Sequence, residues 1–149
     1  MDAVAIDLDG ALGDTRRLWD DWVEDVSRRA RLEVALPTDR ALATAALDDA
    51  LPNWPDLLER FAEDRAPVYL RPDARASAAL RRLHQRGARV GVFTDAPEPL
   101  ARVALAHLGA ARRIDTVAFG DRALERLLAE LGPETQVVRS TAELAAAAP

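Results

Sequence analysis

The 149-residue sequence contains no cysteine and no lysine. Without cysteine, the chain can form no disulfide, no thiolate nucleophile and no zinc–thiolate site. Without lysine, all 20 basic residues are arginines, so any positive charge that a site requires must come from a guanidinium group. No apolar stretch is long enough to span a bilayer, and no basic segment precedes an apolar one as in a signal peptide. We therefore expect a soluble, cytoplasmic protein with no membrane partner.

The charge balance is mildly acidic, because 25 Asp and Glu residues outnumber the arginines and give a formal net charge of −5. This balance does not indicate a nucleic-acid partner. The length fits one domain, or one domain with a small insertion, and it is sufficient to bury a core. Nothing in the composition indicates an oligomeric state.

Two acidic residues follow an apolar run close to the N-terminus. Residues 4–8 have the composition of a buried strand, and Asp7 and Asp9 stand two positions apart at its end. Residues with this spacing on a strand point to the same side. Two close carboxylates repel each other unless a cation or a shared proton intervenes, and a hard divalent cation such as magnesium suits oxygen ligands. The alternative is that these acids only cap the following turn and helix, for which Asp14 and Thr15 are also suitable.

From residue 16 to residue 66 the apolar spacing predicts only helices. The expected helices are residues 16–33, 38–50 and 54–66. Thr38 is the expected N-cap of the second helix, with Leu42 and Leu47 facing inward. All three tryptophans fall in this block, and we interpret them as core packing rather than substrate contacts.

After Pro67, short apolar runs alternate with helical patterns. The expected strands are residues 89–93, 114–119 and 136–139, and the expected helices follow or precede them at residues 72–86, 97–108, 122–131 and 140–148. Strands that alternate with helices predict a parallel sheet with right-handed crossovers.

Thr94 and Asp95 stand at the end of the expected strand 89–93. Ligands of open parallel sheets bind beyond the carboxyl ends of the strands. The Thr94 hydroxyl and the N–H groups of the next helix start are suited to a phosphate oxygen. A helix N-cap is the alternative role for Thr94, and Asp95 either orients the turn or caps the same helix.

The first acidic stretch resembles the first motif of the haloacid dehalogenase-like (HAD) hydrolase superfamily, Asp-x-Asp-Gly-Thr-Leu-x-Asp-Ser/Thr. The matching residues are Asp7, Asp9, Gly10, Leu12, Asp14 and Thr15, with Ala11 in place of the usual threonine. The strand that ends at Thr94 resembles the second motif. The resemblance implies a three-layer, Rossmann-like parallel sheet (residues 1–15 and 67–149) with a small all-helical cap inserted after the first strand (residues 16–66). It also places the strand of Ile6 centrally, between the strands that end at Thr94 and Arg139.

The resemblance further implies a magnesium-dependent phosphohydrolase that acts on a small phosphorylated metabolite. Asp7 would be the nucleophile that forms an aspartyl-phosphate, and Asp9 the general acid and base. Gly10, Thr94 and Asp95 would belong to the phosphate site. A dehalogenase is less favoured, because such members usually lack the second acid.

The C-terminal part departs from the family pattern. The third motif normally supplies a lysine or arginine, and the fourth, often Gly-Asp-x-x-x-Asp, supplies acids that help to hold magnesium. Arg139 and Ser140 fall where the glycine and metal-binding aspartate of the fourth motif belong. Arg122 or Arg139 are candidate phosphate partners, and Asp121 or Glu143 candidate third acids, with Asp121 preferred as a metal ligand alongside Asp7 and Asp9. The alternative is that Ser140 and Glu143 form a capping box, that Arg122 is solvated and that Asp121 merely favours a helix N-terminus.

A second alignment treats residues 119–125 as the fourth motif, with Glu125 as its last acid, but it leaves the last strand and helix without a counterpart. The degenerate tail predicts slow catalysis or none, since loss of one optimised contact to a transition state costs on the order of 10²–10³ in rate. The alternative function is a catalytically inactive HAD-like protein that binds a phosphorylated ligand or a protein partner. A response-regulator receiver is excluded, because it depends on a lysine that this chain lacks.

Overall fold

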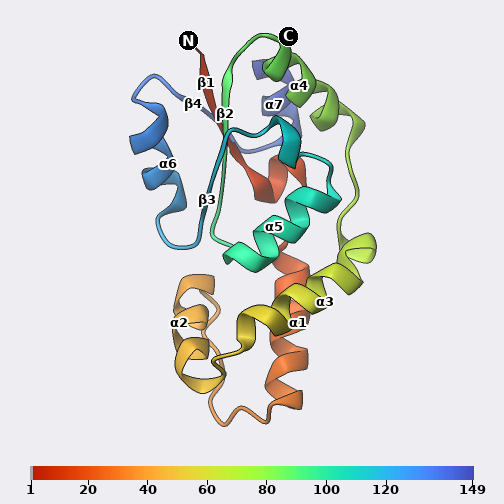
Figure 1. Cartoon of the computed structure of the whole chain (residues 1–149), viewed down its shortest axis with the longest axis vertical. Helices are drawn as coiled ribbons and strands as arrows, with labels where there is room; N and C mark the ends of the chain where they lie inside the picture. Colours follow the sequence, from red (N-terminus) through yellow and green to blue (C-terminus); the bar gives the residue numbers. More distant parts are fainter. Residues whose placement is uncertain (1) are drawn as a thin grey trace.

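A parallel sheet of four strands forms the centre of the computed structural model, which describes residues 2–149 (Figure 1). The strands are β1 (Ala3–Asp7), β2 (Arg89–Thr94), β3 (Thr116–Phe119) and β4 (Gln136–Val138), in the spatial order β3-β2-β1-β4. All neighbours are parallel, and Ile6 of β1 lies opposite both Val92 and Val138. The prediction that the first strand lies between the strands ending near Thr94 and Arg139 is therefore confirmed.

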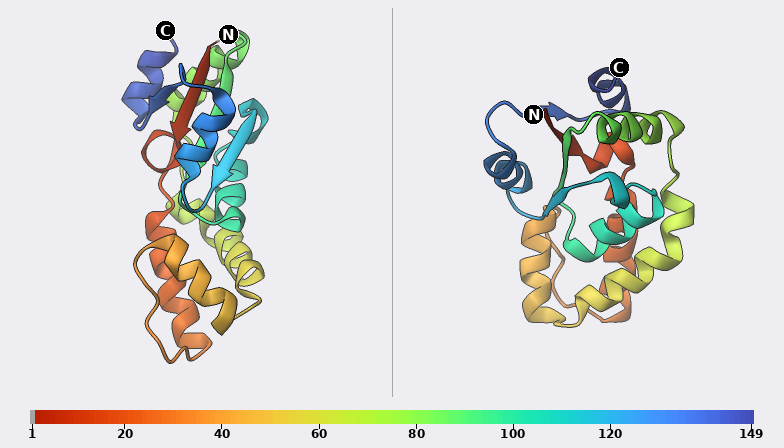
Figure 2. Two further views of the ribbon diagram at one scale, coloured as in Figure 1. Left: turned by 90° about the vertical axis from the view of Figure 1, so that its left-hand side faces the viewer. Right: turned by 45° about the horizontal axis from the view of Figure 1, so that its top comes forward.

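Helices cover both faces of the sheet, as predicted for a three-layer fold (Figure 2). One face packs against α4 (Ala74–Gln85), α5 (Glu98–His107) and α7 (Thr141–Ala147), and the other against α6 (Ala123–Leu131). The strand side chains alternate accordingly. Val4, Ile6, Val90, Val92 and Val138 belong to the first cluster, and Ala5, Phe93 and Ala118 to the second.

Between β1 and α4 the chain forms a helical insertion (residues 16–69) of three helices. These are α1 (Arg16–Arg29), α2 (Arg40–Ala50) and α3 (Trp54–Tyr69). Their buried side chains form a cluster of their own, to which Ala96 and Leu100 also belong. Trp19, Trp22 and Trp54 all lie in this cluster, and the Trp54 indole N–H donates to Asp48 at 2.8 Å. The predicted packing role of the tryptophans is confirmed.

The second helix begins one residue later than predicted, and this changes which side chains are buried. Asp39, not Thr38, is the N-cap, and its carboxylate accepts a hydrogen bond from the Leu42 N–H at 3.0 Å. Leu47 is buried, but Leu42 is 62% exposed, so the prediction that Leu42 faces inward was wrong. The buried face of α2 instead carries Arg40, Ala43 and Leu47.

The other helices of the insertion also differ at their ends from the predicted bounds. The first helix ends at Arg29 rather than at residue 33. The third continues through Pro67 to Tyr69, and side chains of α1 hold its last residue in place. The Tyr69 hydroxyl donates to Asp21 of α1, and the Arg17 guanidinium lies 5.9 Å from the centre of the Tyr69 ring.

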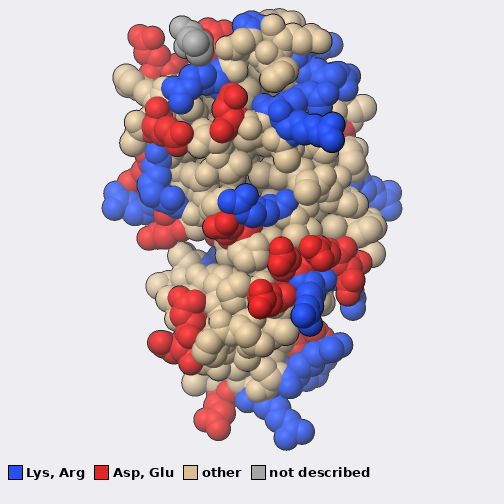
Figure 3. All heavy atoms as spheres, viewed as in Figure 1, with Lys and Arg blue, Asp and Glu red and all other residues tan. Residues whose placement is uncertain are grey.

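The carboxyl ends of the strands point toward the helical insertion, and both chain termini lie at the opposite end of the molecule (Figures 1 and 2). Acidic and basic side chains are interspersed over the face shown in Figure 3, over the sheet-containing part and the insertion alike. Among residues 2–149, no helix has both the length and the apolar character needed to cross a lipid bilayer.

Candidate functional site

A tight turn over Leu8–Leu12 carries the acidic motif away from the end of β1. The Gly10 N–H donates to the Gly13 carbonyl at 2.7 Å, and the Gly13 N–H donates to the Leu8 carbonyl at 3.1 Å. Gly10 has φ +119°, and a Cβ atom there would lie 2.6 Å from the Arg139 carbonyl oxygen. Only glycine tolerates both conditions without strain. Gly10 therefore lets the turn pass directly over the end of β4.

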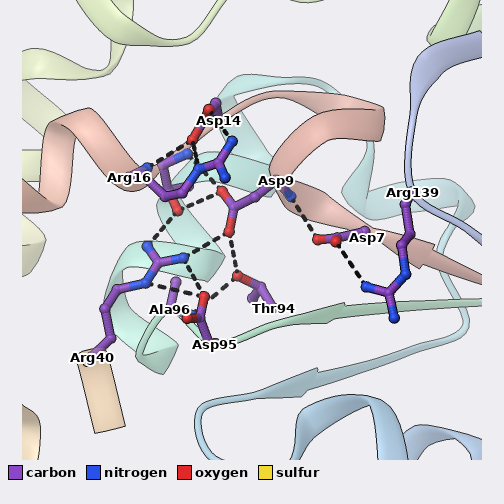
Figure 4. Close-up of polar contacts among 10 residues, drawn as sticks. Asp7, Asp9, Asp14, Arg16, Arg40, Thr94, Asp95, Ala96 and Arg139 are labelled. Carbon is purple, nitrogen blue, oxygen red and sulfur yellow. Dashed lines mark hydrogen bonds and ion pairs between the residues drawn. The ribbon is translucent and has the colours of Figure 1, made fainter. Parts of the chain in front are cut away.

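Asp9 is held by four hydrogen bonds, and its side chain is 8% exposed (Figure 4). One carboxylate oxygen accepts from the Thr15 N–H and the Thr15 hydroxyl, both at 2.7 Å. The other oxygen accepts from the Arg40 guanidinium at 2.7 Å and from the Thr94 hydroxyl at 3.0 Å. These donors fill the lone pairs that a carboxylate offers, so the orientation of Asp9 is fixed.

Arg40 reaches this acid from the first position of α2. Its side chain is only 5% exposed. Besides Asp9, the guanidinium donates from Nη1 to the Thr15 hydroxyl at 2.8 Å and from Nε to Asp95 at 3.1 Å, and Nη2 also contacts Asp95. A buried guanidinium requires such pairing, because an unpaired buried charge is strongly unfavourable. The helical insertion thus contributes a charged residue to the centre of the site.

Asp7 has a more open environment than Asp9. One of its oxygens accepts from the Asp9 N–H at 3.1 Å, and the other lies 3.5 Å from Nη1 of Arg139. Burial and the nearby charge of Asp9 raise the pKa of Asp7 to about 6, although the Asp9 N–H and Arg139 act in the opposite direction. The Arg139 guanidinium also lies 5.4 Å from the centre of the Phe93 ring, which supports it from one side.

A cavity of about 440 Å³ opens beside the two acids. Its walls are formed by residues Asp7, Asp9, Arg16, Phe93, Thr94, Asp95, Gly120, Arg122, Ala123, Leu124, Glu125 and Arg139. The structure therefore brings most of the predicted site residues together. The exceptions are Gly10, which shapes the turn after β1, and the two candidate third acids, Asp121 and Glu143.

Thr94 and Asp95 serve the site through contacts with other side chains. The Thr94 hydroxyl donates to Asp9 and accepts from the Ala96 N–H at 3.1 Å, so it both holds the acid and closes the turn after β2. Asp95 accepts from Arg40 while its side chain is 67% exposed. The N-cap of α5 is Pro97, so the alternative that Thr94 caps this helix was wrong. Contact of the Thr94 hydroxyl with a phosphate oxygen stays a prediction.

The predicted third acid is not brought to the site. Among residues 2–149, no three Asp, Glu, His or Cys residues are grouped so that they could hold a metal ion. Asp121 was predicted as a ligand alongside Asp7 and Asp9. It lies in the turn before α6, and its main-chain carbonyl accepts a hydrogen bond from the Arg126 guanidinium at 2.9 Å. Glu143 accepts from the Arg139 N–H at 3.1 Å, and its own N–H donates to the Ser140 hydroxyl at 3.1 Å. The capping alternative is therefore the observed one for Ser140 and Glu143.

Arg122 lines the cavity but is strongly exposed and pairs with Glu125 in the same helical turn. Its backbone lies in the left-handed region, with φ 56°. Of the two candidate arginines, Arg139 is the one that contacts Asp7.

Sequence reasoning missed Arg40. A signal was present, since Arg40, Ala43 and Leu47 have the spacing of one helix face, and an arginine among small and apolar residues on a buried face requires a partner. Which partner it finds depends on how the insertion docks on the sheet, and this could not be inferred from spacing.

The sequence matches no family model and no curated protein sequence. Solved structures of similar fold are nevertheless found. CbbY from Rhodobacter sphaeroides in complex with phosphate is 16% identical, with a TM-score of 0.65 over 98% of this chain and 83% of that one. A HAD phosphatase from Thermococcus onnurineus is 20% identical, with a TM-score of 0.57 over 99% and 83% of the two chains.

The fold similarity extends to a second activity class. An L-2-haloacid dehalogenase from Xanthobacter autotrophicus is 17% identical, with a TM-score of 0.54 over 92% of this chain and 69% of that chain. Each of these proteins carries its own chemistry on the shared architecture. The central strand with its acidic turn, the flanking helices and the inserted helical segment together give this chain the fold of the haloacid dehalogenase-like hydrolases.

Proposed function

We propose that the chain is a phosphohydrolase that cleaves small phosphate monoesters through an aspartyl-phosphate on Asp7, with the helical insertion acting as a cap over the site. The observation that carries this proposal is the contrast between the two acids of the first motif. Asp9 has both oxygens occupied by donors, whereas Asp7 lies at the cavity wall, 20% exposed, with a single guanidinium near its outer oxygen. Asp7 is thus the carboxylate that is suited to attack.

In the proposed reaction the ionised Asp7 attacks phosphorus, and the bond to the leaving oxygen breaks. The leaving oxygen takes a proton from the carboxyl group of Asp9, for which Asp9 must exchange one of its present donors. The Asp9 carboxylate then removes a proton from a water molecule that attacks the phosphorus of the aspartyl-phosphate. Phosphate leaves, and Asp7 is regenerated.

Arg139 would supply the positive charge that the family pattern assigns to its third motif. Its guanidinium stands next to Asp7 and is 56% exposed, so it is accessible to an incoming phosphate. A guanidinium offers paired N–H donors that match two phosphate oxygens. The charge of the transferred group would then be offset from the β4 side of the site.

Magnesium fits this donor set only in part. Asp7 and the main-chain carbonyl of Asp9 are the groups that would hold it, and Mg²⁺ is commonly bound by one or two carboxylates together with substrate phosphate and water. Residues 2–149 offer no group of three acids for it. When bound, the ion would offset negative charge on the phosphate, and we expect its affinity to be low in the absence of substrate.

The substrate we propose is a small phosphorylated metabolite. The cavity has room for a compact molecule, and its lining combines arginines and acidic residues with a few apolar side chains. Among the proteins that share the fold, CbbY from Rhodobacter sphaeroides has been solved with phosphate and with xylulose-(1,5)bisphosphate. These complexes make phosphorylated sugars a reasonable first panel for this chain.

Release of phosphate from a generic aryl phosphate tests the proposal. We expect slow turnover that magnesium stimulates and that Asp7→Asn abolishes, because the amide cannot form the covalent intermediate. Equal inertness of the wild type and Asp7→Asn, with and without magnesium, would contradict the enzyme hypothesis.

A second candidate function is a non-catalytic protein that binds a phosphorylated ligand or a protein partner. The saturation of Asp9 by four donors favours it, since no proton-accepting position on that carboxylate is free. Saturable binding of inorganic phosphate without turnover of any phosphate ester would support this function over hydrolysis.

A further inference from the structure

Arg40 is the one buried charged side chain of the site for which the proposed reaction has no use. It is not among the residues that line the cavity, and its guanidinium lies against the carboxylates of Asp9 and Asp95, which do line it (Figure 4). Its side chain is 5% exposed, so a ligand in the cavity does not reach it without a rearrangement. Its role must therefore be exerted through the groups that it contacts.

The contacts of Arg40 extend beyond its ion pair with the exposed Asp95, which ties α2 to the loop after β2. In addition, Nη1 donates to the Thr15 hydroxyl and Nη2 to Asp9. The Thr15 hydroxyl in turn donates to the other oxygen of Asp9. The guanidinium therefore acts on both oxygens of this carboxylate, on one directly and on the other through Thr15.

We propose that Arg40 is a positioning residue that the helical insertion supplies to Asp9. The guanidinium sets the direction of that carboxylate, and the acid–base group is correctly placed only while the start of α2 lies against the turn after β1 and the loop after β2. This inference rests on the proposed function for its kinetic consequences, but the position of Asp9 can be measured independently of activity.

Three variants of the full chain separate positioning from simple anchoring. Arg40→Met removes the charge and keeps the length of the side chain. Arg40→Lys keeps the charge but loses the planar fork that bridges Asp9 and the Thr15 hydroxyl. Arg29→Met is the matched control, because it removes one positive charge from the same insertion at an exposed pair with Asp25.

The first readout is amide hydrogen exchange at Thr15, whose N–H donates to Asp9 at 2.7 Å. In Arg40→Met we expect the exchange rate of the Thr15 amide to rise by roughly tenfold or more relative to the rates of the amides of β2. The reason is that the Asp9 carboxylate loses its orientation, which weakens the hydrogen bond from the Thr15 N–H. Arg29→Met should leave this ratio unchanged. The midpoint of thermal unfolding should fall by on the order of 10 °C in Arg40→Met, and Arg40→Lys should recover part of it.

The second readout is aryl phosphate hydrolysis. In Arg40→Met, kcat should fall on the order of 10²-fold with little change in KM, since a misplaced acid–base group costs rate rather than ground-state affinity. Arg40→Lys should restore a part of kcat. If Arg40→Met does not fold, Arg40→Lys and the exchange ratio at Thr15 carry the test.

Two results would overturn the inference. Unchanged Thr15 exchange together with unchanged kcat in Arg40→Met would leave only a structural role. A raised KM with unchanged kcat would instead make Arg40 a substrate ligand. If the wild type itself hydrolyses no phosphate ester, the proposed function fails, whereas the exchange ratio at Thr15 still decides whether Arg40 positions Asp9.

Discussion

The two sides of the site are built on opposite principles. On the side of β2 and the insertion, the side chains of Asp9, Thr15, Thr94 and Arg40 are less than 10% exposed and hydrogen-bond to one another. On the side of β4 and α6, the arginines that face the cavity are exposed, and Arg139 approaches Asp7 at 3.5 Å only. The first side therefore fixes geometry, and the second offers charge to a ligand.

This difference allows stability and catalytic rate, which often fall together when a site is mutated, to be changed separately. Substitutions on the buried side should act mainly on the free energy of unfolding, because they leave charges unpaired in a poorly solvated place. Substitutions on the open side should act mainly on rate or ligand affinity, because exposed ion pairs contribute little to stability.

The largest expected effect on stability is that of Asp9→Ala. Removing this carboxylate leaves the buried guanidinium of Arg40 and the Thr15 N–H without their main acceptor. We expect the free energy of unfolding, measured by urea denaturation, to fall by about 3–5 kcal/mol. Asp95→Ala, which removes the exposed partner of the same arginine, should lower it by about 1 kcal/mol. Equal losses in the two variants would show that burial is not what distinguishes the two acids.

The open side is probed by Arg139→Met. Its loss should lower kcat by on the order of 10²–10³, because a positioned cation next to the reacting phosphate is removed. The free energy of unfolding should change by less than about 1 kcal/mol, given that the side chain is 56% exposed. Arg122→Met serves as the comparison, since Arg122 lines the same cavity but pairs with Glu125 rather than Asp7. A larger loss of rate in Arg122→Met would transfer the phosphate-binding role to Arg122.

A smaller effect, of opposite sign, is expected for Asp7→Asn. The pKa of Asp7 is raised from its ordinary value of 3.8 to about 6 in the folded protein. Folding therefore favours the protonated side chain, and this contribution to stability is fully present below pH 3.8. That contribution is lost as the pH rises through about 6, so the ionised side chain opposes folding at pH 8. Asp7→Asn should therefore raise the free energy of unfolding by roughly 1–2 kcal/mol at pH 8, after allowance for solvent screening, and by nothing at pH 3.5. A gain that does not depend on pH would contradict the raised pKa.

The smallest effect is expected for Ser140→Ala, which tests whether the residue at the position of the missing aspartate belongs to the site at all. The Ser140 hydroxyl accepts from the Glu143 N–H as the N-cap of α7. Its loss should lower the free energy of unfolding by about 1 kcal/mol and leave the rate of hydrolysis unchanged. A tenfold loss of rate without loss of stability would instead place Ser140 in the reaction.

Local patterns predicted much of the architecture. The strands expected at residues 4–8 and 89–93 and the helix expected at residues 72–86 each follow from the pattern within one element, and the structure confirms them as β1, β2 and α4. The places of Asp7, Asp9 and Thr94 at one edge of the sheet follow from the parallel topology, since the carboxyl ends of its strands meet there.

What the sequence did not predict depends on contacts between elements. The partnership of Arg40 with Asp9 joins residues 31 positions apart, and it depends on a helix start that shifted by one residue to Asp39. Asp121 and Glu143 were suitable acids by type, but Glu143 is used by the cap of α7, and Asp121 does not join Asp7 and Asp9. Residue type alone does not distinguish an acid that faces a site from one that caps a helix.

Because Arg40 is the first residue of α2, its position depends strongly on the tilt of that helix. Eleven residues at 1.5 Å each give a length of about 16 Å, so a tilt of about 10° about the far end moves Arg40 by about 3 Å. A hydrogen bond does not survive a displacement of that size. The contact between Arg40 and Asp9 therefore exists only in a narrow range of orientations of α2 relative to the acidic turn.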